Sequence, residues 1–210
     1  MNKIIDTRMV VPYKSFLKLP QFAQYNAAPV VKWRRNLRKE DAKSAQEKSI
    51  EQLIREMDEV NIVKACTFIR TNATVTNDDL LSLLSEHPDR FVGVPHIDLT
   101  DTQEALSAVK KYVIDGPCTA IYLEPGFRLS KVLMHGDDER IFPIYELCET
   151  QSIPVLLQYG GGVNKTDYYK PESIDHIMET FPKLNLAITH GGWPQVMAFC
   201  QLAYRHNGVY

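Results

Sequence analysis

The stretch that decides the fold lies near the end of the chain, where residues 181–194 read FPKLNLAITHGGWP. Residues 184–188 form a short, mostly apolar run with a β-branched side chain, a composition typical of a buried strand. A pair of glycines after this run frees the backbone for a tight turn, and Pro194 is then well placed to begin an amphipathic helix. The stretch therefore predicts a strand that carries His190 at its carboxyl end, followed by a helix.

The same order of strand and helix repeats along the rest of the chain. Apolar runs predict five earlier strands and the start of a seventh, at residues 3–11, 62–69, 90–95, 118–123, 153–157 and 208–210. Between the strands, apolar residues recur at helical spacing, and we expect helices over residues 45–60, from Asn77, from Thr100, around residues 141–148, from Pro171, and from Pro194 to about Arg205. Asn77 is a candidate helix cap, and Thr100 with Gln103 matches a capping box.

This alternation predicts an α/β fold with a parallel sheet and right-handed crossovers. Strands of such uniformly apolar composition are expected to be buried on both faces. A doubly wound open sheet and a (β/α)8 barrel of the TIM type both fit the pattern. The glycine fingerprint of nucleotide-binding folds is missing after the first strand, which weakens a nucleotide-binding interpretation.

The composition narrows the classes of function. The chain has 210 residues, 44% of them hydrophobic and 24% charged, which is ordinary for one soluble domain. A formal net charge of -2 gives no reason to expect nucleic acid or an anionic membrane as partner. The first residues contain too short an apolar run for a signal peptide, and no stretch could span a bilayer. The four cysteines are widely separated, which favours free thiols and a cytoplasmic location.

The residues where the predicted strands end are the candidates for function, because parallel α/β folds bind ligands at the carboxyl edge of the sheet. They are Asp6, Arg8, Arg70, His96, Glu124, Gln158, Tyr159 and His190. Two arginines, two histidines, two carboxylates and an amide suit a small anionic organic ligand. Structural alternatives stay open: Asp6 can cap a turn, Arg70 can pair with Glu124, and Tyr159 can be a packing aromatic.

The sequence resembles the amidohydrolase-related proteins, the family-2 branch of the amidohydrolase superfamily. Near the end of the chain, the resemblance is carried by residues 181–184, 189–194 and 207–210. Earlier in the chain, it is carried by residues 140–146 and 153–155 and by Asp6 at the end of the first strand. The resemblance implies a (β/α)8 barrel and an activity such as amide, lactone or ester hydrolysis, or nonoxidative decarboxylation of aromatic or muconate-like acids. It also implies a divalent metal, zinc or manganese, in most members.

The departures from the family pattern concern the metal. The family's first strand ends in Asp-x-His-x-His, whereas this chain has Arg8 and Val10 at the two histidine places. Gln158 stands where the fifth-strand histidine is expected, and His190 alone keeps a ligand position. Because a catalytic metal needs about three protein ligands, we expect no cofactor, or at most a weakly bound divalent metal at His190.

A (β/α)8 barrel takes roughly 250 residues, so the sequence predicts a single amidohydrolase-like domain over residues 1–210 that is incomplete, with about six βα units. Such an incomplete barrel favours a homo-oligomer or a longer gene product. Three hypotheses follow: an enzyme for a small carboxylated substrate, a degenerate barrel that only binds a ligand or partner, and a metal enzyme with a site relocated to His96, Glu124 and His190. In the first, His190, Asp6 and Glu124 are catalytic, and Arg8, Arg70, His96, Gln158 and Tyr159 bind substrate.

Overall fold

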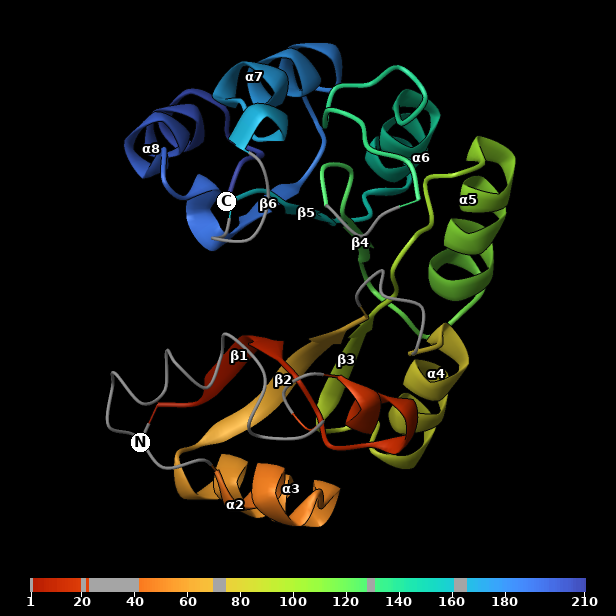
Figure 1. Cartoon of the computed structure of the whole chain (residues 1–210), viewed down its shortest axis with the longest axis vertical. Helices are drawn as coiled ribbons and strands as arrows, with labels where there is room; N and C mark the ends of the chain where they lie inside the picture. Colours follow the sequence, from red (N-terminus) through yellow and green to blue (C-terminus); the bar gives the residue numbers. More distant parts are fainter. Residues whose placement is uncertain (1, 20–21, 23–41, 70–74, 128–130, 161–165) are drawn as a thin grey trace. The chain divides into compact units, whose positions relative to one another are not determined.

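The computed structural model describes residues 2–19, 22, 42–69, 75–127, 131–160 and 166–210 (Figure 1). The described residues divide into two compact units, one reaching Gly93 and the other running from Val94 to Tyr210. Each unit contains parallel strands and helices, and each is described by itself. No helix in the described ranges is both long and apolar enough to cross a membrane.

Unit 1 is a three-stranded sheet with helices. Its strands are β1 (Ile4–Met9), β2 (Ile62–Phe68) and β3 (Phe91–Val94), in the order β1-β2-β3, and β1 runs parallel to β2. Its helices are the short 3-10 helix η1 (Lys14–Lys18), α2 (Lys43–Glu47), α3 (Ile50–Glu59) and α4 (Asn77–Glu86). Of the apolar residues at helical spacing, Ile50, Leu53 and Met57 are buried as predicted and Ile54 is half-buried. Val60, the last residue of the pattern, caps the helix and is 55% exposed.

The expectation that every strand is buried on both faces is wrong for β1. Ile4 is 47% exposed and Ile5 is 60% exposed. Among the described residues β1 pairs with β2 alone, so it is an edge strand of its sheet. Composition identifies a strand but not its position in the sheet, and it is the position that determines how many of its faces are covered.

Unit 2 contains the second sheet. Its strands are β4 (Ile121–Leu123), β5 (Val155–Gln158) and β6 (Leu186–Thr189), all parallel and in the order β4-β5-β6. Its helices are α5 (Thr102–Val109), the π-helix η2 (Lys110–Ile114), α6 (Phe142–Gln151), the 3-10 helix η3 (Thr166–Tyr168), α7 (Pro171–Thr180), the 3-10 turn η4 (His190–Gly192) and α8 (Val196–Arg205).

Short pairings extend this sheet at both sides. His96 forms a parallel bridge with Tyr122 of β4, and Val209 forms one with Leu186 of β6. The second bridge agrees with the predicted start of a seventh strand. One face of the sheet packs on the helices, in a core that includes Leu123, Leu157 and Tyr145 of α6.

Three predicted helix starts are displaced by one or two residues. Thr76, not Asn77, caps α4, since the Thr76 hydroxyl accepts the Asp79 N–H. Asp101, not Thr100, caps α5: the Asp101 carboxylate accepts the N–H groups of Gln103 and Glu104, while the Thr100 hydroxyl donates to Asp98. Helix α8 begins at Val196, two residues after Pro194, because the chain first makes the η4 turn.

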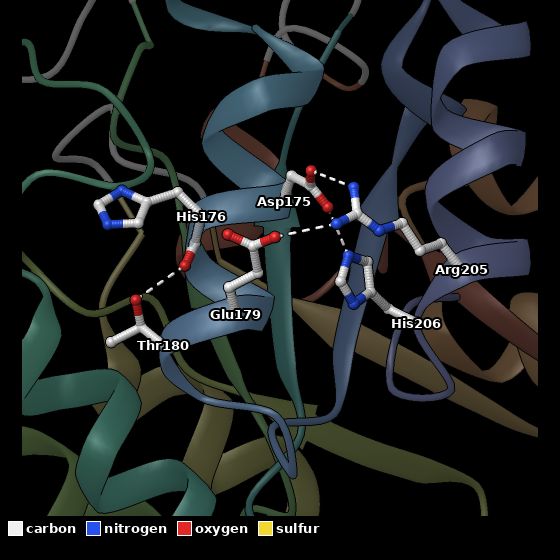
Figure 2. A network of polar contacts seen from close by, with 6 residues as sticks. All are labelled: Asp175, His176, Glu179, Thr180, Arg205 and His206. Atoms are coloured by element: carbon white, nitrogen blue, oxygen red, sulfur yellow. Dashed lines mark hydrogen bonds and ion pairs between the residues drawn. The ribbon is translucent and has the colours of Figure 1, made fainter.

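A polar network joins α7 to the end of α8 (Figure 2). Arg205 reaches two carboxylates of α7: its Nη1 lies 2.5 Å from Asp175 Oδ2 and its Nη2 lies 2.9 Å from Glu179 Oε1. The Nε2 of His206, which is mostly buried, lies 2.6 Å from the other oxygen of Asp175. Asp175 thus contacts both Arg205 and His206, at the point where the chain leaves α8 and returns to β6.

We expect Asp175→Ala to lower the free energy of unfolding by about 1–2 kcal/mol, because the change removes two charge-assisted contacts from a partly buried carboxylate. Glu179→Ala is the matched control on the same helix. It removes one contact from a more exposed carboxylate, and we expect a loss of about 0.5 kcal/mol or less. Urea unfolding of both variants measures the difference; equal losses would show that the network does not depend on Asp175.

Candidate active site at the strand ends of unit 2

Four polar side chains lie on one face of the second sheet, at its carboxyl edge. Tyr122 and Glu124 are two residues apart, so both point to the same face of the sheet. The parallel register places Tyr122 beside Leu156 and Gln158 beside Thr189. Gln158 and Thr189 are therefore on that face as well. We call these four residues the strand-end cluster. The opposite face carries Leu123 and Leu157 and packs on the helices; we call the buried residues there the helix-side core.

Hydrogen bonds connect the members of the strand-end cluster. The Tyr122 hydroxyl lies 3.2 Å from Glu124 Oε1 and also contacts Gln158 Oε1. The Thr189 hydroxyl lies 3.1 Å from the same Gln158 oxygen, and Gln158 Nε2 donates to the carbonyl of Gly160 at 3.3 Å. Tyr122 is fully buried, and Glu124 and Gln158 are each 2% exposed. A carboxyl, a phenol and an amide thus form one buried network, which the half-buried hydroxyl of Thr189 extends at its edge.

His96 lies beside this cluster. The bridge between His96 and Tyr122 brings the histidine next to the first strand of the sheet. Burial lowers the pKa of His96 below its usual value, while the nearby carboxylates of Glu124 and Asp98 act in the opposite direction without reversing the effect. His96 is therefore neutral at pH 7, and in this form its ring can both donate and accept a hydrogen bond.

The lowered pKa of His96 predicts a loss of stability in acid. Near pH 6.5 the unfolded chain takes up a proton at this residue, whereas the folded protein does so only at lower pH. The unfolding free energy contributed by His96 is therefore fully present above about pH 6.5 and falls as the pH drops toward the folded pKa. We expect the unfolding free energy to decrease between pH 7.5 and 5, and His96→Gln to make this decrease smaller in urea unfolding. An unchanged decrease would contradict the lowered pKa.

Tyr159 lies on the other face of the sheet from Gln158. It is fully buried, its hydroxyl accepts the N–H of Gly136 at 3.2 Å, and burial raises the pKa of the phenol. Its ring packs against Tyr169 and Phe199, at centroid distances of 5.3 and 5.9 Å. The structure therefore places Tyr159 in the helix-side core and separates it from the strand-end cluster, because neighbouring residues of a strand point to opposite faces.

His190 follows the cluster residue Thr189 directly and is exposed. It begins the η4 turn with a left-handed φ of 63°, and its carbonyl accepts the N–H of Trp193 at 3.1 Å. The turn lies close to the end of β5: a Cβ added at Gly160 would be 2.6 Å from the Trp193 nitrogen. The chain after β6 thus passes tightly over the end of β5, and this close approach requires glycine at position 160.

The remaining candidates lie elsewhere in the chain. Asp6 and Arg8 belong to unit 1, where Asp6 Oδ1 accepts the backbone N–H of Arg8 at 2.8 Å. The Arg8 guanidinium lies over the ring of Phe68, 5.1 Å from its centroid. Both residues lie within β1, so this contact is local to the strand, and the role of Asp6 in the site stays a prediction. Arg70 is outside the described residues, so its predicted pairing with Glu124 stays a prediction.

The structure brings Glu124 and Gln158 together, as the strand-end argument expected, with His96 nearby. Tyr122 and Thr189 join them, although the sequence argument had not placed either at the site. The signal for Tyr122 was present in the sequence, because it stands two residues before Glu124 and so shares its face of the strand. Thr189 directly follows the predicted strand 184–188 and is the last residue of β6 in the structure, immediately before His190.

The donor set does not fit a tightly bound metal. Within the described ranges, no group of three or more His, Cys, Asp or Glu residues is arranged to hold a metal ion. Gln158, which occupies the expected place of a ligand histidine, has its amide oxygen and nitrogen hydrogen-bonded to neighbours within unit 2. A neutral amide in this arrangement is a poor substitute for imidazole as a zinc ligand.

A family model described as amidohydrolase matches residues 51–210. The chain belongs to this family. A solved TIM-barrel protein of uncharacterised function from Bordetella bronchiseptica is 32% identical, with a TM-score of 0.88, and the match covers 100% of this chain and 74% of that one. The amidohydrolase-like fold class predicted from the sequence, a (β/α)8 barrel type with about six βα units in this chain, is thereby confirmed.

Two further relatives have described activities. A dihydroxybenzoic acid decarboxylase from Polaromonas sp. JS666, solved with bound manganese and the inhibitor 2-nitroresorcinol, is 16% identical over 91% of this chain and 66% of its own, with a TM-score of 0.60. A 2-amino-3-carboxymuconate-6-semialdehyde decarboxylase from Dictyostelium discoideum is 22% identical over 139 residues. The match covers 65% of this chain and only 37% of that relative.

Proposed function

We propose that this amidohydrolase-family chain acts on a small carboxylated organic substrate, by hydrolysis of an amide, lactone or ester or by nonoxidative decarboxylation, without a tightly bound metal. The observation that supports the proposal is the strand-end cluster: a carboxyl, an amide, a phenol and a hydroxyl meet at the edge of the sheet where this fold class performs chemistry. The named relatives, which act on aromatic or muconate acids, support the choice of substrate class.

Under this proposal Glu124, His190 and Asp6 carry the proton transfers. In hydrolysis, one of them accepts a proton from the water that attacks the carbonyl carbon, and another donates a proton to the leaving group. In decarboxylation, one donates the proton that replaces carbon dioxide on the ring or chain carbon. The exposed position of His190 suits exchange of protons with water, and the buried position of Glu124 suits contact with a ligand that has excluded water.

The proposed substrate contacts follow from charge and hydrogen-bonding capacity. Arg8 and Arg70 are the residues proposed to bind carboxylate, since a guanidinium matches its geometry. His96, neutral because of its lowered pKa, and the amide of Gln158 supply hydrogen bonds to the uncharged part of the ligand. Tyr159 is retained as a packing residue behind Gln158, where its buried ring supports the end of β5. The proposed partners are the small acid itself and further copies of the same chain.

A second function is favoured by one observation. The family position of a metal-ligand histidine holds Gln158, whose amide is hydrogen-bonded on both its oxygen and its nitrogen. A barrel that has lost its metal ligands in this way can bind a small anionic ligand without transforming it. This alternative keeps the same binding residues and differs only in the absence of turnover.

A panel of aromatic carboxylates, dicarboxylates and lactone acids tests the proposal. Chromatography and carbon dioxide release measure turnover, calorimetry measures binding, and elemental analysis measures zinc and manganese in the purified protein. We expect turnover of at least one acid and less than one metal per chain. His190→Ala is expected to reduce kcat by about 10²–10⁴ while ligand still binds. Binding without any turnover supports the second function, and stoichiometric metal contradicts the metal-free proposal.

A further inference from the structure

We propose that the hydroxyl of Tyr122 is a positioning residue for the site, one that fixes Glu124 and Gln158 in place and couples the two side chains through a single proton. The proposal rests on the proposed function, because it concerns how the same site is organised. It gives a role to a residue of β4 that is not among the site residues predicted from the sequence.

The geometry around Tyr122 supports this role. Its side chain is fully buried, and its oxygen lies within hydrogen-bonding distance of Glu124 Oε1, at 3.2 Å, and of Gln158 Oε1. Both neighbours are themselves 2% exposed, so water is a poor substitute for the phenol. A phenol has one proton, and it can donate that proton to only one of the two oxygens at a time.

The orientation of the Gln158 amide follows from its other neighbours. The carbonyl of Gly160 can only accept a hydrogen bond, so Gln158 Nε2 is directed at it and Oε1 is directed at Tyr122 and Thr189. The phenol proton is therefore shared between an amide oxygen and a carboxylate. A ligand that donates a hydrogen bond to Gln158 frees the phenol proton for Glu124, and this exchange couples ligand binding to the acid-base group.

The coupling also reaches β6. Gln158 Oε1 contacts Thr189, and Thr189 is joined directly to His190. Removal of the Tyr122 hydroxyl is thus expected to loosen the Gln158 side chain, which then keeps only its contacts with Thr189 and the Gly160 carbonyl. Tyr122 itself acts through these neighbours, which is why it is a positioning residue and not a catalytic one.

Tyr145 offers a matched control in the same unit. It is also fully buried, and its hydroxyl donates one hydrogen bond, to the Gly136 carbonyl at 2.8 Å. It lies on α6 in the helix-side core, away from the strand-end cluster. Tyr122→Phe and Tyr145→Phe therefore remove the same chemical group from equally buried positions, and only the first removes it from the site.

The first experiment measures ligand binding by calorimetry, with 2,6-dihydroxybenzoate and the acid that binds best in the panel as probes. We expect Tyr122→Phe to weaken binding about tenfold or more and to change its pH dependence between pH 5 and 8. Tyr145→Phe is expected to lower the melting temperature but to leave the affinity within about twofold. Equal effects of both variants on affinity, or no effect of Tyr122→Phe, overturn the proposal.

The second experiment needs no ligand and separates this inference from the proposed function. In NMR spectra of the wild-type protein, the Tyr122 hydroxyl proton is expected to be protected from solvent and to show a cross-peak with the side-chain amide of Gln158. Tyr122→Phe is expected to shift and broaden that amide signal, whereas Tyr145→Phe leaves it unchanged. If the wild type binds none of the acids, the proposed function fails. The NMR measurement still decides the role of Tyr122, because it needs no ligand. A rapidly exchanging hydroxyl in the wild type overturns the inference, even where Tyr122→Phe does not fold.

Discussion

Gly192→Ala is expected to lower the free energy of unfolding by about 3–5 kcal/mol, the largest effect on stability that we predict for a single methyl group. Gly192 has a left-handed φ of 64°, and a Cβ at this position would lie 2.0 Å from a ring atom of Phe199. Phe199 is 4% exposed and belongs to the helix-side core of unit 2, so its ring cannot move aside without disturbing that core.

Gly191 is the internal control for this prediction. Its φ of 55° is almost the same, but a Cβ there would meet no described atom within 4 Å. Gly191→Ala therefore carries only the backbone cost of a left-handed alanine, about 1–2 kcal/mol. Urea or thermal unfolding of the two variants separates the cost of the conformation from the cost of the clash. Similar losses in both would mean that Phe199 does not restrict position 192.

Glu124→Gln is expected to reduce kcat by about 10²–10⁴ for any acid that the wild type transforms. The variant keeps the shape of the side chain, and its amide oxygen can still accept a hydrogen bond from Tyr122, so we expect little change in melting temperature. What it loses is the ability to take up and release a proton at the strand-end cluster.

Glu146→Gln is the control, since Glu146 is an exposed residue of α6, and its kcat is expected to equal that of the wild type. Steady-state kinetics on the substrate found in the acid panel provide the measurement for both variants. If Glu124→Gln retains the wild-type kcat, Glu124 takes no part in proton transfer, and the proposed mechanism must rely on His190 and Asp6 alone.

Local patterns in the sequence predicted the elements well and their boundaries less well. The apolar spacing that indicated α3 holds for Ile50, Leu53 and Met57, because helix periodicity depends only on neighbours in sequence, but it fails at Val60, which follows the last helical residue and is 55% exposed. The caps depend on competition between adjacent side chains. Thr100 matched a capping box with Gln103, yet the carboxylate of Asp101 accepts the N–H groups at the start of α5 and caps the helix.

The site was predicted in part. Glu124 and Gln158 could be placed at one edge of the sheet because parallel strands all end there. The contact between Tyr122 and Gln158 could not be predicted, since it joins residues 36 positions apart and depends on the register of β4 against β5. The face on which Tyr159 lies is opposite that of Gln158 because side chains alternate along a strand, and the packing of that face against Tyr169 and Phe199 places Tyr159 in the core.

The sequence by itself determined the alternation of strands and helices and the polar residues available at the strand ends, because these properties follow from local spacing and composition. The family was indicated separately, by a resemblance of particular residues, and the match over residues 51–210 confirms it. The tertiary structure alone decided which of those residues meet. Strand register and side-chain direction together hold Tyr122, Glu124, Gln158 and Thr189 in one network, and both arise from contacts between segments that are distant in the chain.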